Sequence, residues 1–155
     1  MDRVRRFGTG IAGTALVAAG VWIGTQWVAR DAAADAAKSI AVVRIYTGTD
    51  GRSHFEDLRV PLKDAGKVGF LSETVKASGL VFRETGGDYN YDFHVAPRRQ
   101  YVVNLEGEVE IETGDGTKRV LRSGDILLAE DTTGQGHISR SVEGKTRKSL
   151  FITLD

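Results

Sequence analysis

From residue 41 onward, hydrophobic and polar positions alternate over short segments, which predicts a chain built of β-strands. Alternation with a period of two places one side of each strand in a core and the other toward water. Turns rich in Gly and Asp, such as 47–51 and 113–116, separate the segments. The pattern favours an antiparallel sandwich or barrel. The predicted strands cover residues 41–46, 54–60, 80–84, 101–106, 108–112, 118–121, 126–129 and 150–154.

The strand predicted near the middle of this region has two faces of different character. Gln100, Val102 and Asn104 share one face, which we expect to line a cavity inside the barrel. The residues between them are apolar as well, so the outer face must be covered by another element or by another subunit. A homodimer is therefore one expectation. These outer residues are Tyr101, Val103 and Leu105.

The amino-terminal segment shows a different pattern, because residues 7–28 contain no charged residue. At 1.5 Å per residue these 22 residues would extend about 33 Å as a helix, enough to cross a hydrocarbon core of roughly 30 Å. Three arginines precede the segment, whereas two aspartates stand soon after it. The positive-inside rule then places the amino terminus in the cytoplasm and the rest of the chain on the non-cytoplasmic side of the membrane.

These patterns divide the chain into three parts. We predict a single transmembrane anchor with a short cytoplasmic end over residues 1–30, a linker and the entry to the first strand over 31–43, and one folded domain over 44–155. The alternative is a secretory signal peptide, cleaved near Ala34-Asp35-Ala36, which would release the domain as a secreted protein.

Composition excludes several classes of function. Lys plus Arg and Asp plus Glu both number 21, so the formal net charge is zero and no nucleic-acid partner is expected. The absence of Cys excludes disulfides, thiolate catalysis and Cys-ligated zinc. The chain also lacks the nucleophile elbow of hydrolases, the phosphate-binding loop and the dinucleotide fingerprint.

Two groups of residues carry a pattern suited to chemistry. The first runs from His94 through Gln100 to Gly107, and the second begins at Gly124 and returns to His137 after a Gly-rich loop. Together they resemble the two motifs of the cupin superfamily, over roughly residues 44–155. The segment Ala-Pro-Arg-Arg-Gln is similar to that of small uncharacterised bacterial cupin-domain proteins. The resemblance implies an antiparallel β-barrel or jelly roll that holds a metal or a small molecule.

The resemblance also implies a metal centre of three imidazoles and one carboxylate, from which this chain departs. Ala96 stands where the second His of the first motif belongs, and Gln100 replaces the Glu. The remaining candidate ligands are His94, Gln100 and His137, a reduced set for Mn, Fe, Ni or Zn without a negative charge to offset the cation. Absence of any cofactor is the other expectation.

Each of these residues also has a structural interpretation. His94 would then be a rim histidine bonded to a carboxylate, His137 an exposed loop histidine, and Gln100 a buried amide with its hydrogen bonds satisfied. His54 is interpreted as structural.

Ligand binding is predicted for Arg98, Arg99 and Gln100. An arginine beside the pocket entrance can form a fork of hydrogen bonds to a carboxylate or phosphate, although both arginines are equally consistent with solvated loop charges.

The leading hypothesis is a membrane-tethered cupin-domain protein that binds a small molecule, with an organic anion as one candidate. The alternatives are a metal-dependent oxygenase or isomerase with the reduced His/Gln/His site, and a non-catalytic interaction scaffold. An empty apolar cavity with Arg98 at its mouth would favour the binder, whereas a filled interior would favour the scaffold.

Overall fold

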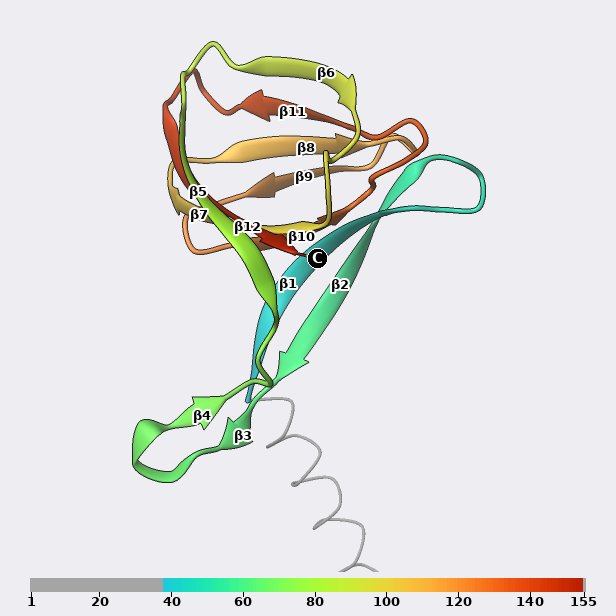
Figure 1. Cartoon of the computed structure of the whole chain (residues 1–155). Coiled ribbons are helices and arrows are strands. Elements are labelled where there is room, and N and C mark those ends of the chain that lie inside the picture. Colours follow the sequence, from blue (N-terminus) through green and yellow to red (C-terminus); the bar gives the residue numbers. More distant parts are fainter. Residues whose placement is uncertain (1–37, 155) are drawn as a thin grey trace, which may run out of the picture. The chain divides into compact units, whose positions relative to one another are not determined.

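The computed structural model describes residues 38–154 (Figure 1), so the predicted anchor or signal segment lies outside the described residues. Within residues 38–154 no helix is long and apolar enough to span a bilayer. This part of the chain contains twelve strands and one short 3-10 helix, η1 (Gly66–Val68). The prediction of an all-β fold is confirmed.

Ten strands form two sheets. In the six-stranded sheet the order is β2 (Ser53–Pro61), β1 (Ser39–Thr47), β10 (Ile126–Glu130), β7 (Gln100–Glu106), β12 (Arg147–Leu154) and β5 (Ala77–Thr85). In the four-stranded sheet it is β6 (Asn90–His94), β11 (His137–Ser141), β8 (Val109–Thr113) and β9 (Lys118–Leu121). A separate hairpin pairs β3 (Lys63–Asp64) with β4 (Phe70–Leu71). The two large sheets form a β-sandwich.

The prediction of purely antiparallel pairing is wrong at one place. β1 runs parallel to β10, with Val43 opposite Leu127 and Tyr46 opposite Glu130. Parallel neighbours require a long connection, which the chain provides because most of the domain lies between these two strands. Alternation along a strand reveals which residues share a face, but it does not reveal the direction of the neighbouring strand.

Several boundaries also differ from those that the sequence pattern predicts. The first strand begins at Ser39, ahead of its predicted start at residue 41. β6, β11 and the β3–β4 hairpin are additional strands that we did not predict. Each is short. β11 carries polar residues on both faces, and β6 alternates but is mostly exposed, so neither has the pattern of a strand with one buried apolar face.

The core lies between the two large sheets. The predicted inner face of β7 is confirmed, because Gln100, Val102 and Asn104 are all buried. A hydrophobic cluster joins residues of β7 and β10, such as Val102 and Leu127, to residues of the opposite sheet, such as Ile111. The sheets do not close completely on each other, and the space that remains beside this cluster is the candidate site.

Candidate functional site

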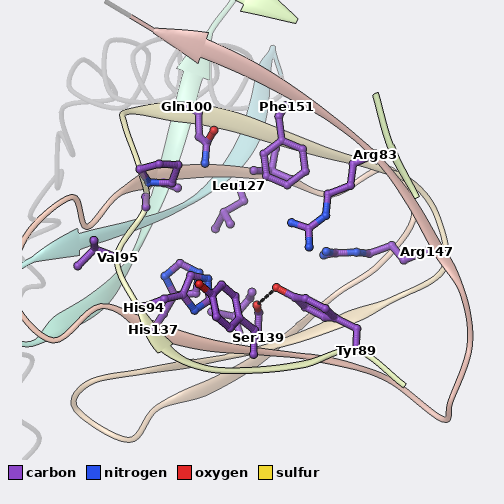
Figure 2. A pocket seen from close by; sticks show the side chains of 16 residues that line it. Arg83, Tyr89, His94, Val95, Gln100, Leu127, His137, Ser139, Arg147 and Phe151 are labelled. Carbon is purple, nitrogen blue, oxygen red and sulfur yellow. Dashed lines mark hydrogen bonds between the residues drawn. The ribbon is translucent and has the colours of Figure 1, made fainter. Parts of the chain in front are cut away.

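A cavity of about 320 Å³ lies between the sheets and takes its lining from both of them. This volume is at the lower end of the roughly 300–1,000 Å³ found for small-molecule sites. His94, Gln100 and His137, the residues that the cupin resemblance implies as a site, all line it (Figure 2). They are joined there by Arg83 and Arg147 from the other side of the cavity.

Two histidines form one wall of the cavity. Nδ1 of His137 lies 2.6 Å from a carboxylate oxygen of the fully buried Asp131, which leaves its Nε2 as the other hydrogen-bonding atom. The rings of His94 and His137 are 4.4 Å apart between centroids, and Tyr91 stacks on His94 at 3.9 Å. The interpretation of His137 as an exposed loop residue is wrong, since it begins β11 and is 7 % exposed.

Burial lowers the pKa of His94, because the ring loses the water that would solvate its charged form. Its Nδ1 lies 2.8 Å from the backbone carbonyl of Asp92. A carbonyl oxygen can only accept, so Nδ1 donates and Nε2 of the neutral ring is left as an acceptor. The structural interpretation of His94 therefore needs correction in one respect: its partner is a backbone carbonyl and not a carboxylate.

A glycine allows the two histidines to meet. His94 and His137 are register partners at the end of the β6–β11 pair, and Gly136 precedes His137 with a φ of 74°. A Cβ at Gly136 would stand 2.1 Å from the backbone oxygen of His94. Only glycine accommodates both this close approach and this backbone conformation.

Gln100 opens β7 and is 7 % exposed. Figure 2 shows its amide directed toward the centre of the cavity. No described residue forms a hydrogen bond with this amide, whereas the inner-face amide of Asn104 donates to the carbonyl of Leu121 at 2.9 Å. The interpretation of Gln100 as an amide already satisfied by the protein is wrong, and its donor and acceptor are available to a ligand.

Arg83 of β5 and Arg147 of β12 place two guanidinium groups in the same cavity (Figure 2). Arg147 is only 5 % exposed and Arg83 is half-buried. Within residues 38–154 neither side chain forms an ion pair or a hydrogen bond. Their described partners are aromatic faces: the guanidinium carbon of Arg83 is 5.1 Å from the Tyr89 ring centroid and 5.5 Å from that of Phe151, and that of Arg147 is 6.0 Å from Tyr89.

The electrostatics of this pair are unfavourable for the protein alone. Burial lowers the pKa of Arg147, and the neighbouring charge of Arg83 lowers it further. A cation over an aromatic face gains about 0.5–2 kcal/mol, which is less than the several kcal/mol that a poorly compensated buried ion loses in hydration. Two adjacent cations without a carboxylate therefore create a strong local preference for an anion.

The sequence pattern did not lead us to these two arginines, although it contained a signal. Every second residue of the last strand points to the same face, so Arg147 shares its face with Ser149 and with the aromatic residue Phe151. Arg83 stands inside a strand that was predicted. The omission arose because charged residues in strands usually face solvent.

The two predicted ligand-binding arginines lie elsewhere. Arg99 donates to Glu130 at 2.8 and 2.5 Å, and Arg44 donates to the same carboxylate. Arg98 lines an adjacent hollow of about 330 Å³ that shares Arg83 and Gln100 with the main cavity. Neither Arg98 nor Arg99 lines the main cavity. Their role in ligand binding stays a prediction.

The donor set does not fit the metal centre that the cupin resemblance implies. Ala96 does line the cavity, but it contributes a methyl group where an imidazole is needed, and Gln100 contributes a neutral amide. The described residues contain no group of three or more His, Asp or Glu side chains arranged to hold a metal ion. His94 and His137 alone leave a divalent cation with two nitrogens and no compensating carboxylate.

His54, interpreted as structural, is remote from the cavity residues and bridges two turns. Its ring nitrogens lie 3.0 Å from Asp50 and 3.0 Å from Asp115. The hydrogen bond with Asp50 is the main reason that the pKa of His54 is raised. The interaction ties the β1–β2 turn to the β8–β9 turn.

Comparison with known proteins finds similarity to solved structures but none to protein families or curated sequences. No protein-family model and no curated protein matches the sequence. Two of the solved structures that the chain resembles each match with a probability of 1.00 and a TM-score of 0.40. One is protein NMB1881 from Neisseria meningitidis, with 18 % identity over 52 % of this chain and 79 % of the other. The second is a putative ethanolamine utilization protein Q from Salmonella typhimurium, with 13 % identity over 76 % of this chain and 97 % of the other.

Proposed function

We propose that this cupin-type domain binds a small organic anion in the cavity between its sheets. A carboxylate or phosphate group would accept hydrogen bonds from Arg83 and Arg147, while Gln100 and the histidine wall contact the opposite end of the ligand. The observation that carries the proposal is the pair of guanidinium groups without a carboxylate partner among the described residues. Guanidinium forks match the geometry of carboxylates and phosphates.

The rest of the cavity indicates the body of the ligand. Apolar surface in the cavity lining comes from Leu127, Val102, Ile111 and Phe151. A ligand with one anionic end and an aromatic or branched aliphatic body would satisfy the charge and bury apolar area at once. The open space also separates this proposal from the scaffold hypothesis, which expects a filled interior.

Isothermal titration calorimetry with benzoate as the probe tests the proposal, with neutral benzamide as the matched control. We expect heat of binding for benzoate and at least tenfold weaker binding for benzamide, since a charge-assisted hydrogen bond contributes about 1.5–3 kcal/mol. Phenyl phosphate and hexanoate would then separate phosphate from carboxylate and aromatic from aliphatic preference. Equal affinity for benzoate and benzamide would contradict an anion site.

We also propose that residues 1–30 tether the domain to a membrane, with residues 31–155 on the non-cytoplasmic side. The uncharged stretch 7–28 and the arginines before it support this orientation. A topology reporter fused after Asp155 should be active only outside the cytoplasm. Release of the mature domain from the cells would favour the signal-peptide alternative, and reporter activity in the cytoplasm would contradict both.

A further inference from the structure

The β3–β4 hairpin and the segment that follows it expose four large apolar side chains. Val68 is 75 % exposed, Leu71 52 %, Val75 51 % and Phe70 40 %. We call these four residues the hairpin patch. The hairpin pairs only with itself and forms a sheet apart from the two large ones, so the patch does not belong to the core or to the cavity. An exposed apolar group of this kind marks an interaction site.

Three lysines lie on or beside the hairpin, together with the acidic residues Asp64 and Glu73. The Nζ of Lys38 lies 4.2 Å above the ring of Phe70, and Lys67 occupies the 3-10 turn between the two strands. Lys63 forms an ion pair with Glu73. An apolar tip bordered by lysines suits a bilayer interface: apolar side chains enter the boundary between headgroups and acyl chains, and the ammonium groups remain at the level of the phosphates.

The hairpin lies next to the start of the described domain, close to the predicted membrane-spanning stretch, and this position favours a bilayer as its partner. Lys38 is the first described residue, and its carbonyl accepts a hydrogen bond from the amide of Leu62, just before β3, at 2.9 Å. Nine residues separate Val28 from Lys38, so the connection between them spans at most about 36 Å when fully extended. A bilayer crossed by that stretch would therefore lie within reach of the hairpin.

From these observations we propose that the β3–β4 hairpin rests on the membrane surface. Its partner is a bilayer containing anionic phospholipid, with the hairpin patch in the acyl boundary and Lys38 and Lys67 at the headgroup phosphates. Each lysine near an anionic surface contributes about 1 kcal/mol. The contact gives the tethered domain a second attachment point. It is independent of ligand binding in the cavity.

The absence of Cys from the chain allows a direct test with single labelled cysteines. Val68→Cys places a nitrobenzoxadiazole fluorophore on the hairpin. Thr49→Cys is the matched control: it is exposed and lies in the turn at the opposite end of the β1–β2 ribbon, about 30 Å away along nine-residue strands. Full-length protein is reconstituted in vesicles of phosphatidylcholine and phosphatidylglycerol, with or without a lipid that carries a doxyl quencher.

The label at position 68 should emit at shorter wavelength and be quenched by doxyl lipid, whereas the label at position 49 should respond only to aqueous iodide. Adding Phe70→Ser and Leu71→Ser to the Val68→Cys background should abolish most of the lipid quenching without lowering the melting temperature of the domain. Equal responses at positions 68 and 49 would overturn the proposal. So would shielding of position 68 in detergent that increases with protein concentration, because a second copy of the chain would then cover the patch.

Discussion

Replacing Arg147 by Met should stabilise the ligand-free protein and weaken anion binding at the same time. Methionine keeps an unbranched stem of similar length and removes only the charged end. Arg147 is 5 % exposed and has no carboxylate partner among the described residues, so no opposite charge of this part of the chain offsets the burial of its guanidinium. Opposite effects on folding and on binding are characteristic of a functional residue.

The magnitudes follow from its surroundings. Burial and the charge of Arg83 both lower the pKa of Arg147, so the charged form is disfavoured in the folded state. Replacing poorly compensated buried charges by apolar groups of similar volume typically stabilises a protein by about 1–4 kcal/mol. Loss of a charge-assisted hydrogen bond to the ligand costs about 1.5–3 kcal/mol, which corresponds to a reduction of roughly 10- to 150-fold in affinity.

Urea unfolding at neutral pH without added anion measures the first effect, and calorimetric titration with benzoate measures the second. Arg122→Met is the matched control, because Arg122 carries the same charge at an exposed position on the surface. It should change neither quantity by more than about 0.5 kcal/mol. The reasoning is refuted if Arg147→Met lowers the free energy of unfolding while leaving the affinity for benzoate unchanged.

Three further predictions concern the metal question, the pH dependence and the backbone. Ala96→His with Gln100→Glu restores a full set of metal ligands, so this double variant should gain thermal stability with Mn²⁺ whereas the parent should not. An equal change in melting temperature with Mn²⁺ in both proteins would contradict this prediction. Because Asp50 raises the pKa of His54 above 6.5, protonated His54 contributes stability below pH 6.5 that disappears as the pH rises through the raised pKa. Thermal melts from pH 5 to 9 should therefore show a loss that His54→Gln abolishes; identical pH profiles would contradict the assignment. Gly136→Ala should destabilise the fold far more than the control Gly116→Ala, which costs about 1 kcal/mol for its positive φ alone. A Cβ at Gly136 would stand 2.1 Å from a backbone oxygen, whereas a Cβ at Gly116 would have nothing within 4 Å; equal denaturation midpoints would disprove the close contact.

The sequence allowed the inner face of the sheet to be predicted because the responsible signal is local. Gln100, Val102 and Asn104 repeat with the period of a strand, and burial follows that repeat. The meeting of His94 with His137 could be anticipated only through the cupin resemblance, since residues 43 positions apart in the chain share no local pattern. Parallel pairing of β1 with β10 was not anticipated for the same reason.

The arginines that line the main cavity are not the two arginines that the sequence pattern singled out. Arg98 and Arg99 stand beside the motif in sequence, whereas Arg83 and Arg147 reach the cavity through strands β5 and β12, which pair with each other. That pairing depends on the whole chain path. The ion pair between Arg99 and Glu130 could not be predicted either, because no spacing in the sequence indicates that these two residues meet.

The most direct test of the central claim is a crystal structure of the protein grown with benzoate at neutral pH. We expect the carboxylate to lie within hydrogen-bonding distance of the guanidinium groups of Arg83 and Arg147, with the ring against Leu127 and Phe151. Benzoate bound elsewhere, or both arginines turned out of the cavity toward solvent, would contradict it.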